Sequence, residues 1–486
     1  MASLPSSVAA PEPGRQPVAF RGGLPDLNHA PDVRLPLRFM LAGLMSLAAA
    51  LGILVAQPHL LTAYHYHHHV VAITHLLVLG FLLSVVFGAT YQLVPVALET
   101  RLHSERLARW HFPIHLVSVA SMVWMFWVWN MKEVGHFGSG LALGAGFFVW
   151  NIARTLRRVS RWDPVAFGIA SMLVWLTATV AAGLAVAAAK STYELVDRPG
   201  LHPLLAAPLQ GLRAIADAVA RFDALGVMHA HAHLGVLGIF ILLTIAIAYR
   251  LVPMFLISEV QRPARAWASL ILLNLGLVTI AFALPLQPAW KPLAALLTVA
   301  GLACYGIELA AIVHARRRRT LDWGLRAFLT AQALLVPVAA LGLLLSRPGL
   351  ALTEFIGRLE NLYGFLALFG VVAFAILGML YKILPFLVWF ATYSREVGRS
   401  RTPTLQEMIS VPLQMAGYTL WIAGLVVIST AILLAHDLLA RIGASVLAAS
   451  FVTFLVNAAR ILRHRFQPQL APLAHPGNRP STATLP

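Results

Sequence analysis

Long apolar stretches recur along almost the whole chain, and they constrain its fold more than any other feature. Each covers about 20 residues, enough to cross a hydrocarbon layer roughly 30 Å thick as a helix. Hydrophobic residues make up 59% of the 486 positions and charged residues only 11%, too little charge to cover a soluble protein of this size. The chain is therefore predicted to be an all-α integral membrane protein. Twelve spans are predicted, at 37–56, 69–96, 111–131, 137–156, 164–189, 226–257, 266–286, 292–313, 323–345, 361–391, 411–435 and 441–462.

Arginine residues gather in every second connection between these spans, and this asymmetry predicts the orientation. Connections rich in Lys and Arg stay in the cytoplasm, so both termini are predicted to be cytoplasmic and the protein to lie in a bacterial inner membrane. The net charge of +17 is explained by these turns, so the lipid bilayer is the expected partner and nucleic acid is not. Representative residues of these connections are Arg101, Arg154, Arg262, Arg316, Arg395 and Arg460.

The spans form one predicted membrane domain, 35–463, between two segments without long apolar runs. Residues 1–34 are rich in Pro, Gly and Ser, and we expect them to be a flexible cytoplasmic segment. Residues 464–486 are expected to be a flexible cytoplasmic tail. The single cysteine, Cys304, excludes a disulfide framework or a thiolate cluster within the chain. Metal chemistry in this sequence must therefore rely on histidine.

An internal repeat sets the predicted architecture. The second span reads HLLVLGFLLSVVFGATYQLVP from His75, and the sixth reads HLGVLGIFILLTIAIAYRLVP from His233, in register without gaps. The tenth span continues the pattern but has Phe365 at the histidine position. Twelve spans therefore divide into three units of four, which predicts a pseudo-threefold helical bundle. The units cover roughly 35–160, 164–320 and 323–463.

This arrangement resembles the heme–copper oxidase superfamily, which includes cytochrome oxidase subunit I and the nitric oxide reductases. The run from His75 to Pro95 is similar to the heme-ligating second span of the nitric oxide reductase type. The His-Ala-His pattern from His229 to His233 also resembles that of NnrS-type heme proteins. The resemblance implies twelve spans in three arcs, a heme cofactor, and partners such as a c-type cytochrome or other respiratory subunits.

The sequence departs from that family where the binuclear centre would be built. The family takes a pair of histidines from the seventh span and two more from the tenth. Here no histidine lies between His233 and His314, or between His314 and His436. The standard centre for oxygen or nitric oxide reduction cannot be assembled, so we expect a diverged relative, and whether it is an enzyme stays open.

Two histidine clusters remain, TAYHYHHHVVAITH from Thr62 and GVMHAHAHLG from Gly226. Histidines inside a membrane span usually face a partner in the bundle, and neutral imidazole is a common ligand for heme iron, copper and zinc. Helical spacing puts His229 and His233 on one face and His231 on another. His75 and His233 are predicted to bind the cofactor. The predicted metal ligands are His229, His231, His68 and His69.

The cofactor and the function stay open at this point. The resemblance favours a b-type heme, whereas the clustering of histidines with no acidic ligand nearby keeps a copper or zinc ion as the alternative. The first hypothesis is a heme protein in respiratory electron transfer or in handling nitric oxide or another small gas. The alternatives are a copper or zinc transport protein and a structural subunit of a respiratory complex. Glu308 is a candidate for a proton path or for a simple ion pair, and His111 and His115 are expected at the membrane interface.

Overall fold

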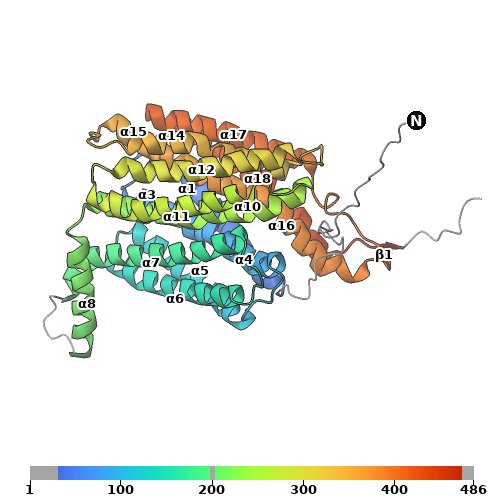
Figure 1. Cartoon of the computed structure of the whole chain (residues 1–486), viewed down its shortest axis with the longest axis horizontal. Helices are drawn as coiled ribbons and strands as arrows, with labels where there is room; N and C mark the ends of the chain where they lie inside the picture. The colour runs from blue at the N-terminus through green and yellow to red at the C-terminus, as the bar shows by residue number, and fades with distance from the viewer. Residues whose placement is uncertain (1–30, 197–202, 473–486) are drawn as a thin grey trace, which may run out of the picture.

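The structure, a computed structural model, describes residues 31–196 and 203–472, which pack as one bundle of long helices (Figure 1). The first repeat ends at residue 156. A short helix, α2 (His59–Thr62), connects its first two spans. Its spans are α1 (Arg34–Ala56), α3 with η2 and α4 (His68–His75, Leu76–Leu83 and Ser84–Ala97), α5 (Glu105–Trp127) and α6 (Met131–Leu156).

The second repeat has the same order, with one extra helix. Helix α8 (Pro203–Val219) departs from the direction of the bundle at the left end of Figure 1. The four spans are α7 (Pro164–Val196), α9 with η3 and α10 (Ala224–Gly235, Val236–Ile241 and Leu242–Leu256), α11 (Pro263–Leu286) and α12 (Lys291–His314).

The third repeat completes the bundle. Its first span is broken into α13 (Trp323–Ala333) and α14 (Leu335–Leu345). The other spans are α15 with η4 and α16 (Glu354–Phe365, Leu366–Ala373 and Phe374–Tyr393), α17 (Val411–Leu434) and α18 (Asp437–Phe466). A 3-10 turn, η5 (Ser394–Glu396), follows α16. Helix α6 packs on α7, α12 on α14 and α18 on α1, so the three repeats form a closed ring.

The predicted all-α membrane fold is confirmed. Ten helices in the described part of the chain are long and apolar enough to cross a membrane. The third and fourth predicted spans, α5 and α6, are not among them, but they run as long helices packed on each other and on α3 and α7. Both begin six residues earlier than the sequence predicts, at Glu105 and Met131, because Ser104 and Asn130 cap their first turns.

The second span of each repeat lies at the centre of the bundle. Within the most apolar stretch of these three spans, 61%, 78% and 67% of residues are buried, against 28–44% in the other seven candidate spans. Each contains a π-helical segment that begins one to three residues after the position matched in the sequence repeat, which is His75, His233 or Phe365. Segment η4 contacts both η2 and η3. π-helical turns are rare and often mark functional sites. Because one occurs in each of the three repeats, a functional site is expected beside these segments.

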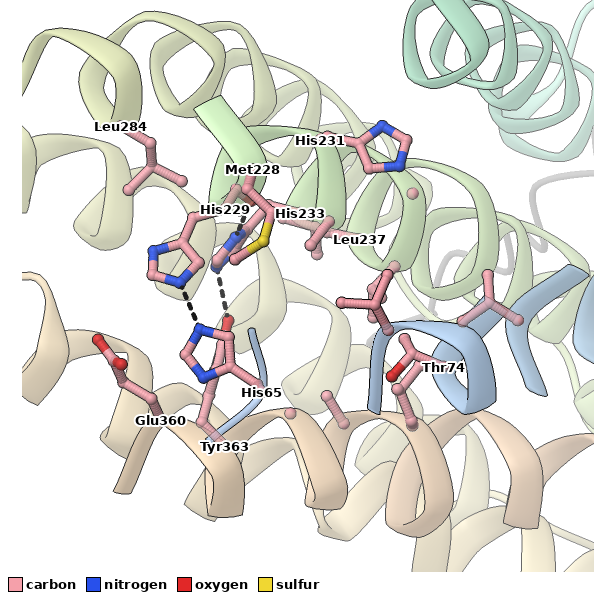
Figure 2. Close-up of a pocket in the computed structure, with 18 of the residues that line it drawn as sticks. His65, Thr74, Met228, His229, His231, His233, Leu237, Leu284, Glu360 and Tyr363 are labelled. Atoms are coloured by element: carbon pink, nitrogen blue, oxygen red, sulfur yellow. Dashed lines mark hydrogen bonds between the residues drawn. The ribbon is translucent and has the colours of Figure 1, made fainter. Parts of the chain in front are cut away.

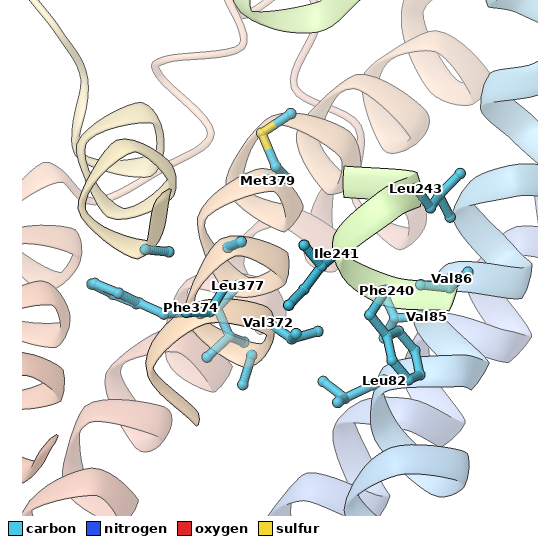
Figure 3. Close-up of a cluster of buried hydrophobic side chains, with 14 of the residues drawn as sticks. Leu82, Val85, Val86, Phe240, Ile241, Leu243, Val372, Phe374, Leu377 and Met379 are labelled. Atoms are coloured by element: carbon cyan, nitrogen blue, oxygen red, sulfur yellow. The ribbon is translucent and has the colours of Figure 1, made fainter. Parts of the chain in front are cut away.

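At the ends of the π-helical segments, apolar side chains close the centre of the bundle. Figure 3 shows side chains from the three central spans meeting there, among them Leu82, Phe240 and Val372. All three are at most 1% exposed. The bundle therefore has a dry middle layer, and the cavity described below lies on one side of it.

Residues 464–472 are more structured than the sequence predicts. The segment expected to be a flexible tail begins inside α18, which extends to Phe466. Beyond it, β2 (Ala471–Pro472) pairs antiparallel with β1 (Ser400–Arg401). Tyr393 explains this anchoring, since its hydroxyl bonds the ring of His464 and accepts from the backbone N–H of Gln469. Residues 1–30 and 473–486, which make up most of the two predicted flexible segments, lie outside the described residues.

Candidate functional site

A cavity of about 790 Å³ lies where the second spans of the three repeats begin. Its volume lies within the range of pockets that hold cofactors and drug-sized ligands, roughly 300–1,000 Å³. Most of its wall is Leu, Val, Ile and Ala. Five histidines line it, which are His65, His75, His229, His231 and His233. The two clusters in the sequence thus share one cavity, although His67, His68 and His69 are outside its wall.

His75 and His233, the predicted cofactor ligands, are held in the same way. The Nδ1 of each bonds the carbonyl four residues earlier, at Val71 (2.8 Å) and at His229 (2.7 Å). A carbonyl only accepts, so Nδ1 carries the proton in both rings and Nε2 keeps its lone pair. A lone pair on Nε2 is what a heme or metal ligand needs. The Nε2 of His233 lies 3.1 Å from the hydroxyl of Tyr363, which donates to it.

His231 lies on the other face of α9, as the helical spacing predicts, and points away from His229 and His233 (Figure 2). Its Nδ1 donates to the carbonyl of Thr179 (3.1 Å), so its Nε2 also keeps a lone pair. Its ring lies beside that of His75, with 6.4 Å between centroids and 17° between planes. Gly183 makes room for this ring, because a Cβ there would lie 2.9 Å from Cε1 of His231. The ring of His75 also stacks on Phe126, at 4.3 Å between centroids, and His231 is the cavity imidazole that lies beside it.

A second imidazole pair forms at the other side of α9. The Nε2 atoms of His65 and His229 are 3.0 Å apart (Figure 2). The carboxylate of Glu360, on α15, completes a group whose ligand atoms lie within 4.8 Å of one another. Burial lowers the pKa of His65 below its usual 6.5, against a smaller opposing effect of its bond to Asn361. The neutral ring, which is the form that binds metals, is therefore favoured.

Polar groups stand at the outer edge of the cavity. The ammonium of Lys190 donates to the hydroxyl of Tyr66 (2.8 Å) and lies 5.9 Å from the ring of Trp129. All three residues line the cavity. Such an edge offers a cation and a hydroxyl to an acidic group at the end of an otherwise apolar ligand.

The predicted metal ligands His68 and His69 lie with His67 outside the cavity. The ligand atoms of these three residues are within 4.8 Å of one another, and His67 is exposed. The ring of His69 stacks on Trp127 at 4.1 Å between centroids, and His68 lies 5.8 Å from Trp129. A role for this group in metal binding stays a prediction.

Glu308 is fully buried, but its carboxylate is already engaged. Its Oε1 accepts from the backbone N–H groups of Gln261 (2.6 Å) and Arg262 (2.8 Å), and Oε2 lies 3.4 Å from the guanidinium of Arg265. These contacts favour the simple ion pair, with a different arginine from the Arg316–Arg319 group near the end of α12. The proton path stays a prediction.

His111 and His115 lie inside the bundle, and their position at the membrane interface stays a prediction. Their side chains are only 0% and 2% exposed, because α5 begins at Glu105 and places both residues well inside the bundle. His111 bonds the hydroxyl of Tyr91 (3.0 Å), and His115 bonds that of Ser84 (2.9 Å).

Glu360, Asn361 and Tyr363 are cavity residues that were not predicted. All three stand on α15 in the third repeat. The repeat itself could have found two of them. When Phe365 is matched with His233, Tyr363 matches His231 and Asn361 matches His229. The third repeat therefore supplies polar side chains at two of the three positions where the second repeat has imidazoles.

No family model and no curated protein sequence matches the chain. Among solved structures, it is similar to a chain from the cryo-EM structure of a heme-copper terminal oxidase dimer. The match has a TM-score of 0.60 at 11% sequence identity and covers 92% of this chain and 87% of that chain. At this identity the likeness concerns the fold, and it confirms the architecture that the repeats predict. The chain therefore has the fold of a heme-copper terminal oxidase.

Proposed function

We propose that the chain is a membrane protein that holds a b-type heme in its cavity and serves electron transfer or the handling of a small gas such as nitric oxide. The observation that carries this proposal is the pair of nearly parallel imidazoles, His75 and His231, at the wall of an apolar cavity. Metal–imidazole bonds are about 2.0 Å long, and two such bonds to one metal atom fit within the 6.4 Å between the ring centroids.

The residues present fit a heme. The Nδ1 of each ring is bonded to a backbone carbonyl, which fixes the tautomer and orients Nε2 as a ligand. The apolar wall suits a porphyrin, and Lys190 with Tyr66 at the outer edge suits its propionates. A bound b-type heme would supply one-electron chemistry and a site for a small gas.

His233 is the alternative second ligand. It occupies the repeat position of His75, and its Nε2 also keeps a lone pair. The hydroxyl of Tyr363, however, already donates to that atom at 3.1 Å. This bond favours His231 as the partner of His75, and leaves His233 and Tyr363 as a polar pair that could hold a proton beside the cavity.

The proposed membrane, orientation and electron donor rest on the arginine pattern and on the resemblance to heme–copper oxidases. We propose that the protein lies in a bacterial inner membrane with both termini in the cytoplasm. Its electrons would come from a c-type cytochrome or another respiratory subunit. The absence of histidine from the seventh and tenth spans argues against a standard terminal oxidase.

The test is a visible spectrum of the detergent-purified protein, oxidised and dithionite-reduced, with elemental analysis for iron. We expect stoichiometric iron and a reduced α band of the b type. His75→Ala and His231→Ala should each lower heme occupancy at least roughly tenfold, since even an outer-shell change can cost that much at a metal site. His136→Ala, at an exposed position on α6, is the matched control and should keep the heme.

A subtler variant separates loss of a ligand from misfolding. In Gly183→Ala the added methyl would meet the ring of His231 and displace it without removing it, so the α band should shift. Gly135→Ala has open space around the new methyl and should leave the spectrum unchanged. Absence of a Soret band from folded wild-type protein would rule out the heme proposal. Loss of heme in His233→Ala but not in His231→Ala would reassign the second ligand.

A further inference from the structure

Three side chains from separate parts of the chain converge beside the proposed heme ligands. His65 stands in the connection before α3, His229 on α9, and Glu360 on α15. Figure 2 shows the two rings facing each other, with the carboxylate of Glu360 to one side. Zinc and copper ions take bonds of about 2.0–2.2 Å from imidazole and carboxylate. Two nitrogens on one tetrahedral ion then lie about 3.3 Å apart, close to the observed 3.0 Å.

Asn361 fixes the protonation of His65. Its Oδ1 accepts from the backbone N–H of His65 (3.1 Å), and its Nδ2 donates to the carbonyl of Ala63 (2.8 Å). These two bonds set the orientation of the amide. Because Oδ1 also lies 3.2 Å from Nδ1 of His65, that nitrogen carries the proton. The Nε2 of His65 is therefore a lone pair directed at His229, oriented by an outer partner as metal-bound imidazoles are.

The environment of Glu360 is suited to a ligand. The Tyr64 hydroxyl donates to its Oε2 at 3.4 Å, a long bond that leaves the carboxylate free to coordinate. The ammonium of Lys291, which donates to Gln287 (3.2 Å), is the nearby cation that partly balances its charge. A divalent ion would satisfy the carboxylate and both lone pairs of the facing imidazoles. Without an ion, His229 must donate its own Nε2–H to His65.

We propose that His65, His229 and Glu360 bind one divalent ion of the zinc and copper class. Two imidazoles and one carboxylate leave a fourth position open, as in catalytic rather than structural zinc sites. Both His65 and His229 line the cavity, so the open position is accessible to a small ligand held there. This site shares no ligand with the proposed heme pair, His75 and His231. The two proposals can therefore be tested independently.

The experiment is metal analysis of the full-length detergent-purified protein, stripped with a chelator and titrated with Zn²⁺ or Cu²⁺ alone. We expect the wild-type protein to bind one metal ion tightly per chain. Glu360→Gln keeps the size and hydrogen bonds of the side chain but removes its charge, and His229→Gln removes a nitrogen ligand. Each should weaken binding at least roughly tenfold. Glu354→Gln, on the same helix and with 82% of its side chain exposed, is the matched control and should bind as the wild type does.

Two further measurements make every outcome decisive. The Cu²⁺-loaded wild type should give an electron paramagnetic resonance spectrum with coupling to two nitrogens, reduced to one in His229→Gln. His75→Ala, designed to lose heme, should still bind one metal ion tightly. The metal-site proposal therefore stays testable if the heme proposal fails. The proposal is overturned if monodisperse wild-type protein binds neither ion tightly, or if Glu360→Gln binds as tightly as the wild type, since the facing rings are then only a hydrogen-bonded pair.

Discussion

At the scale of single residues, three buried side chains perform the same task in the three repeats. Each accepts a hydrogen bond from a backbone N–H just before the third span of its repeat, and each stands 47 residues after that N–H. The pairs are Ser104 with Asn151, Gln261 with Glu308, and Ser410 with Asn457. Glu308 is thus the second repeat's version of a structural asparagine. The two asparagines can be recognised as a repeat in the sequence. The third residue of the set cannot, because it is a glutamate.

This equivalence predicts how Glu308 responds to substitution. Glu308→Gln keeps an acceptor oxygen, so its melting temperature in detergent should stay close to that of the wild type. Glu308→Leu leaves the part-buried N–H groups of Gln261 and Arg262 without their acceptor, which costs up to about 1–3 kcal/mol each, and it should unfold at a lower temperature. Loss of a proton-coupled activity in Glu308→Gln, without a change in its melting temperature, would favour the proton path over the structural role.

At the scale of helices, close contacts hold each central span against the first span of its own repeat. The matched glycines Gly80, Gly238 and Gly370 face Ser46, Trp175 and Leu334. A Cβ on these glycines would lie 2.8, 2.7 and 3.2 Å from the nearest side-chain atom. The glycine pattern could be read from the sequence. The π-helical segments could not, because the same apolar residues fit an α-helix, and only the packing of three central spans selects the wider turn.

The tightest of these contacts gives a direct test. Gly238→Ala would force its methyl into Trp175, and overpacking of this kind costs about 1–3 kcal/mol. We expect a lower melting temperature in detergent. Gly306→Ala, in α12, adds its methyl to open space and should not destabilise the protein. Equal stability of the two variants would show that helix α7 can shift away from the central span.

At the scale of the whole molecule, the sequence predicts the class, the repeats and the spans, because these depend on local hydropathy and register. It also predicts His75, His229, His231 and His233 as site residues, because these histidines cluster within or beside apolar spans. It does not predict that His65 meets His229, or that α15 supplies Glu360. Those contacts depend on which faces of distant helices turn inward, and that is decided by packing across the ring.

Orientation belongs to this scale and can be measured by labelling. In a Cys304→Ala background, Arg318→Cys and Arg347→Cys place a thiol in two exposed connections, after α12 and after α14. The arginine pattern predicts that 318 faces the cytoplasm and 347 the opposite side. A membrane-impermeant maleimide added to intact cells should therefore label Arg347→Cys only, and both after lysis. Labelling of Arg318→Cys in intact cells would invert the assigned topology.

The apolar layer beneath the cavity bears on energy conservation. Val85, Val86 and Val372 lie outside the cavity wall and continue the packing below it. Electrons cross such a layer by tunnelling, whereas a proton needs polar groups or water to carry its charge. This apolar cluster offers no polar group to carry a proton from the cavity directly through it (Figure 3). A proton taken up or released by redox chemistry in the cavity would therefore have to travel by another route.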